Sequence, residues 1–589
     1  MTGLNLVPAS AYTARNGTQR SPECPSESGH RNPDRLHVSH GKKTILILGG
    51  GFGGVYTAVY LEKFMTAAER KDIAIVIVSR DNYIVFQPLL PEVISGSVQL
   101  NHVISPIRRL ARTARLCTRE VESIDLANHT VRLSPGVKPV PLTIAYDHLV
   151  IALGTRLDYG NIPGMREHAS PFKYLGDALY LRNQLVRSLE EAETETDPEL
   201  RRALLTFVVA GGGFSGVECI AEMNDFLREA VRSYQNIHEK DLRLVLLQRG
   251  ERIVPELTEG LGAFAHKLLV KRGVEIQLGA GLKAVSADAV VVEDVKTKQT
   301  RAIHTRTTVA TVPAGPHPLL AALALPKEKG RIKVDEGTEV PDSPGVWALG
   351  DCALVKQVDG NFSPPTAQHA LRQAKTCAQN ILASIRGTKK QAFAFTGLGK
   401  LGSLGHRSAV AEISGIRLKG LIAWLLWRGV YVTKFPGLDG QLRLVFDWIL
   451  DVFLPRDITQ LRLFHDEAVD REHFEPGESV FHAGDFGDKV YFIAKGEAAV
   501  ARDGQTVATL HSGDVFGEAA LVSNQPRNAS VTAVTALDVV VVNRAAFHEL
   551  LGNLPGLRGN IEQIMGSRMG RSVDLDKEVM DAMSSTTQH

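Results

Sequence analysis

KKTILILGGGFGGVYTAVYLEKF, residues 42–64, predicts a buried strand, a tight glycine turn and a helix in direct succession. The apolar run Thr44–Leu48 is the strand, and Gly49, Gly51 and Gly54 follow it with the GxGxxG spacing. In this context the first glycine makes the turn, the second lets a pyrophosphate approach the backbone, and the third lets helix and strand pack closely. The stretch therefore predicts a dinucleotide site, with the phosphates at the N-terminus of the helix.

The same pattern recurs in LLTFVVAGGGFSGVECIAEM, residues 204–223, where Gly211, Gly213 and Gly216 follow a second apolar strand. A single GxGxxG can be an ordinary glycine-rich turn, but two of them in strand–turn–helix context weaken that alternative. The sequence thus predicts two Rossmann-type domains that bind two dinucleotides.

Length and composition are those of a globular protein with three or four domains. The 589 residues are 44% hydrophobic and 22% charged, and the net charge of +2 leaves no footprint of nucleic-acid binding. The five cysteines show no CxxC or CxxxxC spacing, which favours a reducing, cytoplasm-facing location without a redox-active pair. We also expect no metal site.

Neither a membrane span nor a signal peptide is predicted, since no apolar run reaches the roughly 18 residues of a spanning helix. Residues 1–42 are rich in Ser, Pro, Arg and Asn, and we expect a disordered tail there. A transit peptide is the lesser alternative because Glu23, Glu27 and Asp34 are acidic.

Three further segments resemble the FAD-dependent pyridine-nucleotide oxidoreductases: VWALGDCA (346–353), YDHLVIALGT (146–155) and TTVATVPAG (307–315). In that family the first places an Asp beside the flavin, and the other two are crossover strands. The resemblance implies the order FAD, NAD(P), FAD along the chain. The implied FAD site consists of Gly49, Gly51, Phe52, Gly53, Gly54, Ser79 and Asp351. The implied nicotinamide site consists of Gly211, Gly213, Gly216 and Gln248.

Within that family the chain resembles most the type II NADH dehydrogenases, the non-proton-pumping NADH:quinone oxidoreductases. The resemblance is carried by NYIVFQPLLPEV (82–93), PPTAQHALRQA (364–374) and LIAWLLWRGVYVTKFPG (421–437). It implies that the flavin passes its electrons directly to a quinone, because the chain lacks the cysteine pair of the disulfide reductases. Ala367 and Gln368 map to the place where quinone and nicotinamide approach the isoalloxazine, and Glu218 maps to a nearby carboxylate. The plainer alternatives are helix capping for Gln368 and an exposed first-turn acid for Glu218.

The acids expected at the end of each second Rossmann strand are absent. Ser79 and Gln248 stand there instead, and Gln does not repel a 2′-phosphate as Glu would. Since Arg249 or Arg252 could pair with that phosphate, we expect NADPH to be accepted beside NADH or in preference to it. Pro313 stands where the family has an aromatic residue.

The stretch LRLVFDWILDVF, residues 442–453, predicts an amphipathic helix whose polar side carries Arg443, Asp447 and Asp451. Its apolar side carries Leu442, Val445, Phe446, Ile449, Leu450 and Phe453. The aromatic residues nearby are Trp424, Trp427, Tyr431 and Trp448. The resemblance favours a pair of helices in the lipid interface, on the cytoplasmic face, where a quinone tail could enter. A homodimer interface or an ordinary core helix explains the periodicity equally well.

From about Leu463 onward, short strands separated by glycines predict an all-β roll. The stretch resembles a cyclic-nucleotide-binding domain with a phosphate cassette at residues 516–521 and 526–530. The implied site consists of Gly517, Glu518, Arg527, Ala529 and Ser530. Arg527 would bind the cyclic phosphate and Glu518 the ribose 2′-hydroxyl. Asn528 does not decide between cAMP and cGMP, and the tail after the last predicted helix (557–569) is too short for a helix-turn-helix.

The sequence therefore predicts an α/β fold with two Rossmann-type domains, amphipathic membrane-surface helices, and an all-β roll with flanking helices. The expected domains are an FAD-binding domain (43–160 and 303–390), an NAD(P)-binding domain (161–302), a membrane-surface region (391–460), a cyclic-nucleotide-binding domain (461–570) and a polar tail (571–589). The predicted activity is that of an FAD-dependent NAD(P)H:quinone oxidoreductase, modulated by a cyclic nucleotide. A soluble NAD(P)H-ferredoxin-type reductase and a non-catalytic nucleotide-sensing flavoprotein are the rival functions.

Overall fold

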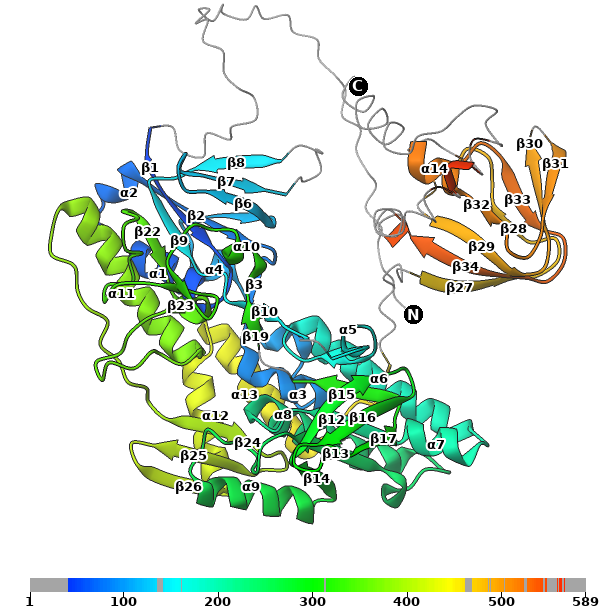
Figure 1. The fold of residues 1–589 in the computed structure, drawn as a ribbon, viewed down its shortest axis with the longest axis horizontal. Helices are drawn as coiled ribbons and strands as arrows, with labels where there is room; N and C mark the ends of the chain where they lie inside the picture. Colours follow the sequence, from blue (N-terminus) through cyan, green and yellow to red (C-terminus); the bar gives the residue numbers. More distant parts are fainter. Residues whose placement is uncertain are drawn as a thin grey trace, which may run out of the picture. The chain divides into compact units, whose positions relative to one another are not determined.

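The structure is a computed structural model of the chain (Figure 1). It describes residues 41–134, 141–159, 162–311, 314–460, 469–485, 487, 489–502, 504–523, 527–543, 546, 547, 559, 561–563 and 566. The chain forms two compact units. The first consists of Met1–Asn82, Ala111–Gly154 and His317–Phe395, and the second of Tyr83–Leu110, Thr155–Pro316 and Thr396–His589. Pro313, most of the predicted N-terminal tail and most of the predicted last helix lie outside the described residues.

A five-stranded parallel sheet forms the centre of the first unit (Figure 1). Its order is β22 (Val346–Ala348), β9 (His148–Ile151), β1 (Lys43–Leu48), β2 (Ile73–Ser79) and β5 (Arg115–Thr118), with every neighbouring pair parallel. Helix α1 (Phe52–Phe64) follows β1 and packs against α11 (Ala367–Arg386). Because β1, β2, β9 and β22 are buried along most of their length, the centre of the sheet is covered on both faces, as parallel sheets require.

Smaller elements complete this unit. An antiparallel sheet contains β6 (Val121–Asp125), β7 (Thr130–Leu133) and β8 (Leu142–Ala145). Another small sheet contains β20 (Lys327–Glu328), β21 (Arg331–Lys333) and β23 (Ala353–Leu354). The short helices are α2 (Glu69–Asp72), α10 (Pro318–Ala321) and the 3₁₀ turn η5 (Gly350–Cys352).

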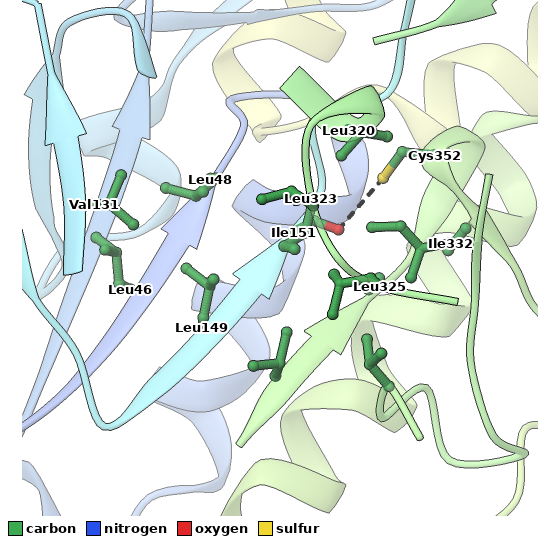
Figure 2. Packing of buried hydrophobic residues seen from close by; sticks show 14 of the residues in the cluster. Leu46, Leu48, Val131, Leu149, Ile151, Leu320, Leu323, Leu325, Ile332 and Cys352 are labelled. Carbon is green, nitrogen blue, oxygen red and sulfur yellow. Dashed lines mark hydrogen bonds between the residues drawn. The ribbon is translucent and has the colours of Figure 1, made fainter. Parts of the chain in front are cut away.

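The core of the first unit lies where β1 and β9 meet the segment around α10 and η5 (Figure 2). Leu48 and Ile151 from the sheet belong to the same buried cluster as Leu320 and Ile332. The Cys352 thiol points into this cluster and donates to the Ile151 carbonyl at 3.4 Å (Figure 2). Burial raises the pKa of that thiol to about 11, so it stays protonated and structural. This packing fixes η5 at the carboxyl end of β22.

A second parallel sheet lies at the centre of the second unit. Its order is β11 (Ser170–Pro171), β18 (Thr307–Ala310), β12 (Thr206–Ala210), β13 (Arg243–Gln248) and β14 (Val274–Leu278). The helices of this region are α6 (Leu175–Thr194), α7 (Pro198–Leu204), α8 (Phe214–Ala230), α9 (Glu259–Lys271) and α5 (Met165–His168). An antiparallel sheet contains β15 (Ala280–Val285), β16 (Ala289–Asp294) and β17 (Thr300–His304), and β10 (Thr155–Leu157) pairs with β19 (Ala314–Pro316). The two predicted Rossmann-type folds are thus confirmed.

Two more segments of the second unit pack around α8. One contains β3 (Tyr83–Val85), α3 (Leu90–Ser95), β4 (Ile104–Pro106) and α4 (Ile107–Leu110). The other contains β24 (Lys400–Ser403), β25 (Ala409–Ile413), β26 (Ile416–Gly420), α12 (Leu421–Lys434) and α13 (Leu438–Phe453). Both α3 and β24 contact α8. Of the helices in the described part of the chain, none combines the length and apolar character that crossing a bilayer requires.

The C-terminal part of the chain is the predicted all-β roll. One four-stranded sheet has the order β27 (Val469–Phe474), β34 (Leu537–Asn543), β29 (Lys489–Lys495) and β32 (Val515–Phe516). The other has the order β28 (Ser479–Phe481), β33 (Ser530–Ala533), β30 (Ala498–Arg502) and β31 (Gln505–Leu510). Side chains from both sheets share one buried cluster, and α14 (Glu518–Ser523) follows β32.

Candidate functional site

The first glycine turn leaves room for a ligand at one position only. Gly49 has φ 120° and donates its N–H to the Val78 carbonyl at 2.9 Å, which closes the turn on β2. A β-carbon at Gly49 would collide with the Ala152 carbonyl, and one at Gly54 with the Gly49 carbonyl. At Gly51, the residue before α1, a β-carbon would meet no atom within 4 Å. The turn therefore fits a pyrophosphate at Gly51, while Gly49 and Gly54 are needed by the fold itself.

The other residues of the implied FAD site lie at the carboxyl edge of the same sheet. Ser79 is buried at the end of β2, and Asp351 is half-buried in η5, directly after β22. The Gly350 N–H donates to Gln373 Oε1 at 2.8 Å, which ties η5 to α11. Phe52 and Gly53 open α1 and are buried, with the Leu349 side chain against Gly53. Ligands of open α/β sheets bind at this edge.

Ala367 and Gln368 are the first two residues of α11, and both are half-buried. The N-cap residue is Thr366, so Gln368 is the second residue of the helix and not its N-cap. His369, which the sequence analysis did not single out, is buried beside them, and its Nδ1 is 2.7 Å from Thr366 Oγ1. Its Nε2 is buried without a hydrogen-bond partner among the described residues. An orphaned polar atom next to Gln368 fits a polar cofactor or substrate at this end of α11.

The second glycine turn is contacted by the side chains of Gln248 and Thr311. Gly211 has φ 119°, and a β-carbon at Gly216 would meet the Gly211 carbonyl and Thr311 Oγ1. Gln248 at the end of β13 accepts from the Gly212 N–H at 3.1 Å and donates to the Arg252 carbonyl at 3.0 Å. Both ends of the Gln248 amide are therefore bound to the backbone.

A carboxylate stands beside this turn. Glu256 Oε1 lies 3.3 Å from the place where a β-carbon on Gly213, the N-cap residue of α8, would stand. Arg252 donates to the Pro255 carbonyl at 2.7 Å, whereas the Arg249 side chain is exposed. Sequence reasoning missed Glu256 because it lies eight positions beyond Gln248 in a loop with no recognisable motif. The loop 249–258 thus supplies charges of both signs around the expected phosphate position.

Glu218 is buried on α8, so the alternative of an exposed first-turn acid is wrong. Its Oε1 accepts from the Ser403 N–H of β24 at 3.0 Å. Burial raises the pKa of Glu218 to about 8; the Ser403 bond opposes the rise, and the carboxylates of Glu222 and Glu92 add to it. Glu92 on α3 and Glu222 on α8 are also buried. Glu218 is therefore protonated at neutral pH, which suits a group that holds a proton for a reaction.

The predicted amphipathic helix exists as α13, with its polar side turned inward. The apolar residues of the predicted stripe are all exposed: Leu442, Val445, Phe446, Ile449, Leu450 and Phe453. Asp447 is buried, accepting from the Gln99 N–H at 3.0 Å and lying 2.7 Å from His102 Nδ1. Arg443 stays exposed. Because the stripe faces solvent, the ordinary core-helix alternative is wrong.

In the C-terminal roll Arg527 is buried rather than directed to solvent. Its guanidinium donates to the carbonyls of Gly517 at 2.5 Å and Lys489 at 2.7 Å, and it stacks 4.2 Å above the Phe481 ring. Gly487 leaves the space that this guanidinium fills. The other predicted residues lie nearby in sequence: Glu518 begins α14, Ala529 is buried, and Ser530 begins β33. The Ser530 hydroxyl accepts from the Ala483 N–H at 2.9 Å.

Comparison with known families agrees with this architecture. Residues 43–374 match the family model described as pyridine nucleotide-disulphide oxidoreductase, residues 398–457 match the NDH2 C-terminal domain, and residues 471–553 match the cyclic nucleotide-binding domain. The structure of NDH2 from Plasmodium falciparum in complex with NADH has a similar fold, with a TM-score of 0.66 and 19% identity over 71% of this chain and 100% of that one.

Two curated relatives are similar over nearly their whole length. The type II NADH:quinone oxidoreductase Ndh of Mycobacterium tuberculosis is 29% identical and covers 77% of this chain and 95% of the relative. The demethylphylloquinone reductase NdbB of Synechocystis is 30% identical and covers 70% of this chain and 97% of the relative. The chain therefore belongs to the pyridine nucleotide-disulphide oxidoreductase family and, within it, to the type II NADH:quinone oxidoreductases, with a cyclic nucleotide-binding domain at its C-terminal end. It is an oxidoreductase, and FAD is typical of its family.

Proposed function

We propose that the protein binds FAD at the first glycine turn and NADH or NADPH at the second, and reduces a quinone at a membrane surface. The balanced reaction is NAD(P)H + H⁺ + quinone → NAD(P)⁺ + quinol. FAD, when bound, supplies the carrier that accepts a hydride and gives up two electrons. The observation that carries the proposal is the free space at Gly51. No protein atom lies within 4 Å of a β-carbon placed there, whereas backbone carbonyls occupy that space at Gly49 and Gly54.

Each site residue has a role that its position supports. Gly51 admits the pyrophosphate, Ser79 offers a hydroxyl to the adenosine ribose, and Asp351 accepts hydrogen bonds at the carboxyl edge of the sheet. Gln368 and Ala367 present the start of α11 to the reacting rings. The Glu218 carboxyl group, protonated at neutral pH, holds a proton for quinol formation.

Both nicotinamide donors are part of the proposal. The neutral Gln248 brings no charge against a 2′-phosphate, and the exposed Arg249 is available to pair with one. Curated relatives of both kinds exist: the enzyme of Mycobacterium tuberculosis is named for NADH, and one of Solanum tuberosum for NAD(P)H. Comparing kcat/KM for the two donors tests this point, and negligible NADPH oxidation at every ionic strength would contradict it.

The membrane surface is proposed from α12 and α13. Leu421, Ile422 and Leu425 on α12 are exposed like the apolar stripe of α13, whereas the charged Asp447 and the polar indole of Trp448 are buried beneath. An exposed apolar surface above a charged interior suits helices that lie in the lipid interface. The proposed location is the cytoplasmic face of the membrane, as a peripheral protein. The alternative is that this apolar surface contacts a second copy of the chain in a homodimer.

The C-terminal roll is proposed to bind cAMP or cGMP and to modulate turnover. Arg527 already lies beside Gly517 of the predicted cassette, and Glu518 and Ala529 are buried next to them in sequence. Arg527 now donates to two backbone carbonyls. If it donated instead to the negatively charged cyclic phosphate, the hydrogen bonds would be charge-assisted on both sides and therefore stronger than those to the carbonyls.

Extraction of flavin from the purified full chain, together with NADH oxidation with and without a short-chain quinone, tests the proposed function. The expected result is about one FAD per chain and NADH oxidation that depends on quinone. A protein that contains no flavin, or that oxidises NADH at the same rate without quinone, would contradict the proposal.

A further inference from the structure

Five side chains of the second unit form one continuous chain of contacts across three helices. Glu92 Oε2 on α3 accepts from Trp448 Nε1 on α13 at 2.7 Å, and Glu92 Oε1 lies 3.6 Å from Arg428 Nη2 on α12. The same Arg428 nitrogen lies 3.9 Å from Asp451 Oδ2 on α13. The other oxygen of Asp451 lies 3.5 Å from Arg456 Nε. Asp451 therefore forms ion pairs with both Arg428 and Arg456.

Arg456 belongs to the segment that follows α13. Its Nε lies 3.6 Å from Glu229 Oε2 on α8, and its backbone N–H donates to Glu229 Oε1 at 3.0 Å. The next residue, Asp457, accepts through its backbone carbonyl from the Arg182 guanidinium of α6. Arg456 and Asp457 thus hold the beginning of residues 454–460 against α8 and α6 by polar contacts. The same residues lead, in sequence, to the cyclic nucleotide-binding domain at 471–553.

The contacts are sheltered from water. The exposed fraction of the side chain is 4% for Glu92, 13% for Arg428 and for Arg456, and 17% for Asp451. Arg428 also lies between two indoles, with its guanidinium carbon 4.0 Å from the Trp424 ring centre and 4.5 Å from that of Trp448. Removing one partner from such a chain leaves an uncompensated buried charge, so a displacement of Arg456 is not absorbed locally. Such a displacement changes the ion pair between Asp451 and Arg428. It thereby also changes the ion pair between Arg428 and Glu92.

Burial also raises the pKa of Glu92, to about 8, and the positive charge of Arg428 opposes that rise. A negative charge on Glu92 in turn helps to raise the pKa of Glu218. Glu92 belongs to α3, which packs on α8, the helix that carries Glu218 and begins at the second glycine turn. A change at Glu92 therefore acts on a residue to which the proposed reaction assigns a proton.

We propose that Arg456 and Asp451 are positioning residues that transmit the nucleotide state of the C-terminal domain, through Arg428, to Glu92 and α3. This inference rests on the proposed binding of a cyclic nucleotide. The nucleotide can shift the catalytic unit only as far as it prefers one arrangement of residues 454–460 over another. Couplings of this kind typically change affinity or turnover by about 5-fold to 150-fold.

The test uses the full FAD-loaded chain as the wild type, as Arg456→Gln and as Asp451→Asn. Arg232→Gln is the matched control, because Arg232 pairs with Glu239 at 3.6 Å on the surface, where its side chain is 73% exposed. For each protein the Kd of cAMP and of cGMP is measured by titration calorimetry. The kcat and KM for NADH and for a short-chain quinone are then measured with and without saturating nucleotide.

In the wild type and in the control we expect turnover or KM to change by about 5-fold or more on nucleotide binding. In Arg456→Gln and Asp451→Asn we expect Kd within about twofold of the wild type but a response below about 1.5-fold, since only the transmission is lost. Arg456→Lys restores the positive charge and should recover part of the response, which separates transmission from misfolding. Amide hydrogen exchange of residues 90–95 should change with nucleotide in the wild type and stay constant in Arg456→Gln.

The outcomes separate this inference from the function on which it rests. Wild-type protein that binds neither nucleotide overturns the proposed nucleotide binding and the transmission together. Wild-type protein that binds a nucleotide without any change in kcat, KM or amide exchange overturns the transmission and the proposed modulation, but leaves the oxidoreductase standing. A response in Arg456→Gln equal to that of the wild type overturns the transmission alone.

Discussion

The indole nitrogen of Trp448 donates a hydrogen bond of 2.7 Å to the buried carboxylate of Glu92, which joins α13 to α3. On the opposite side of α13, the apolar residues face outward. The pair thus marks the boundary between a charged interior and an apolar surface. This arrangement reverses that of an ordinary surface helix, whose polar side faces water.

Replacing Trp448 by Phe should lower the midpoint of thermal unfolding. The change removes a neutral donor to the buried Glu92 carboxyl group, which Arg428 also contacts, and an unsatisfied buried acceptor costs about 1–3 kcal/mol. Trp427→Phe is the matched control, because Trp427 is also buried while its Nε1 has no hydrogen bond to a carboxyl group among the described residues. Differential scanning calorimetry on the two variants measures the difference. Equal losses of Tm would show that lost packing volume, and not the hydrogen bond, determines the effect.

The stability of the Glu218→Gln variant, compared with that of the wild type, should increase as the pH rises. The folded-state pKa of about 8 exceeds the ordinary 4.5, so the folded state binds more protons than the unfolded state between these values. Stability therefore falls as the pH rises through that window, and the loss is complete above about pH 8. Gln keeps an oxygen that can accept from the Ser403 N–H but has no proton to lose.

The measurement is the Tm of wild type and Glu218→Gln at a series of pH values between about 5 and about 9. The difference in Tm, variant minus wild type, should grow with pH. Glu251→Gln serves as the control, because the Glu251 side chain is 84% exposed. A difference that stays constant across the series would contradict the raised pKa.

Replacing Gly51 by Ala should lower the flavin content without unfolding the chain. No protein atom lies within 4 Å of the new methyl group, but the methyl occupies the position proposed for the pyrophosphate. Gly176→Ala, at an equally open position in α6, should keep its FAD. Absorbance of the purified proteins gives the ratio of flavin to protein, and circular dichroism checks the fold. Full flavin content in Gly51→Ala would place the cofactor elsewhere.

Replacing Leu442 and Phe446 together by Glu should release the protein from lipid vesicles. These side chains are 72% and 61% exposed in the apolar stripe of α13, and two charges there oppose insertion into the interface. Val507→Glu, on an exposed position of β31, should leave vesicle binding unchanged. Sedimentation with vesicles made from bacterial polar lipids measures binding. If the double variant instead separates a dimer and still sediments, the apolar stripe is a contact between copies of the chain.

Sequence patterns predicted the elements that local chemistry determines. The two glycine turns were found because only glycine tolerates the φ of Gly49 and Gly211 and the close approach at Gly54 and Gly216. The stripe of α13 was found from its period, although periodicity alone could not tell which side faces the protein. That choice depends on partners distant in sequence, such as Gln99 and His102 for Asp447.

The parts that the sequence did not predict depend on tertiary contacts. Glu92 was quoted only as part of a segment, since nothing local shows that Trp448 and Arg428 converge on it from 336 and more positions away. Glu218 is likewise hydrogen-bonded to β24, at Ser403, which lies 185 positions away in the sequence. Gln248 was identified as a replacement for an acid, but its bonds to Gly212 and Arg252 became visible only in the folded loop. The domain boundaries and the roles of the site residues stay predictions.

Anaerobic stopped-flow absorbance of the purified protein tests the central claim most directly. Mixing with NADH should bleach the flavin absorbance, and a second mixing with a short-chain quinone should restore it, with one quinone consumed per NADH. Flavin that bleaches with NADH but is not reoxidised by quinone, or flavin that NADH never bleaches, would contradict the assignment as an NADH:quinone oxidoreductase.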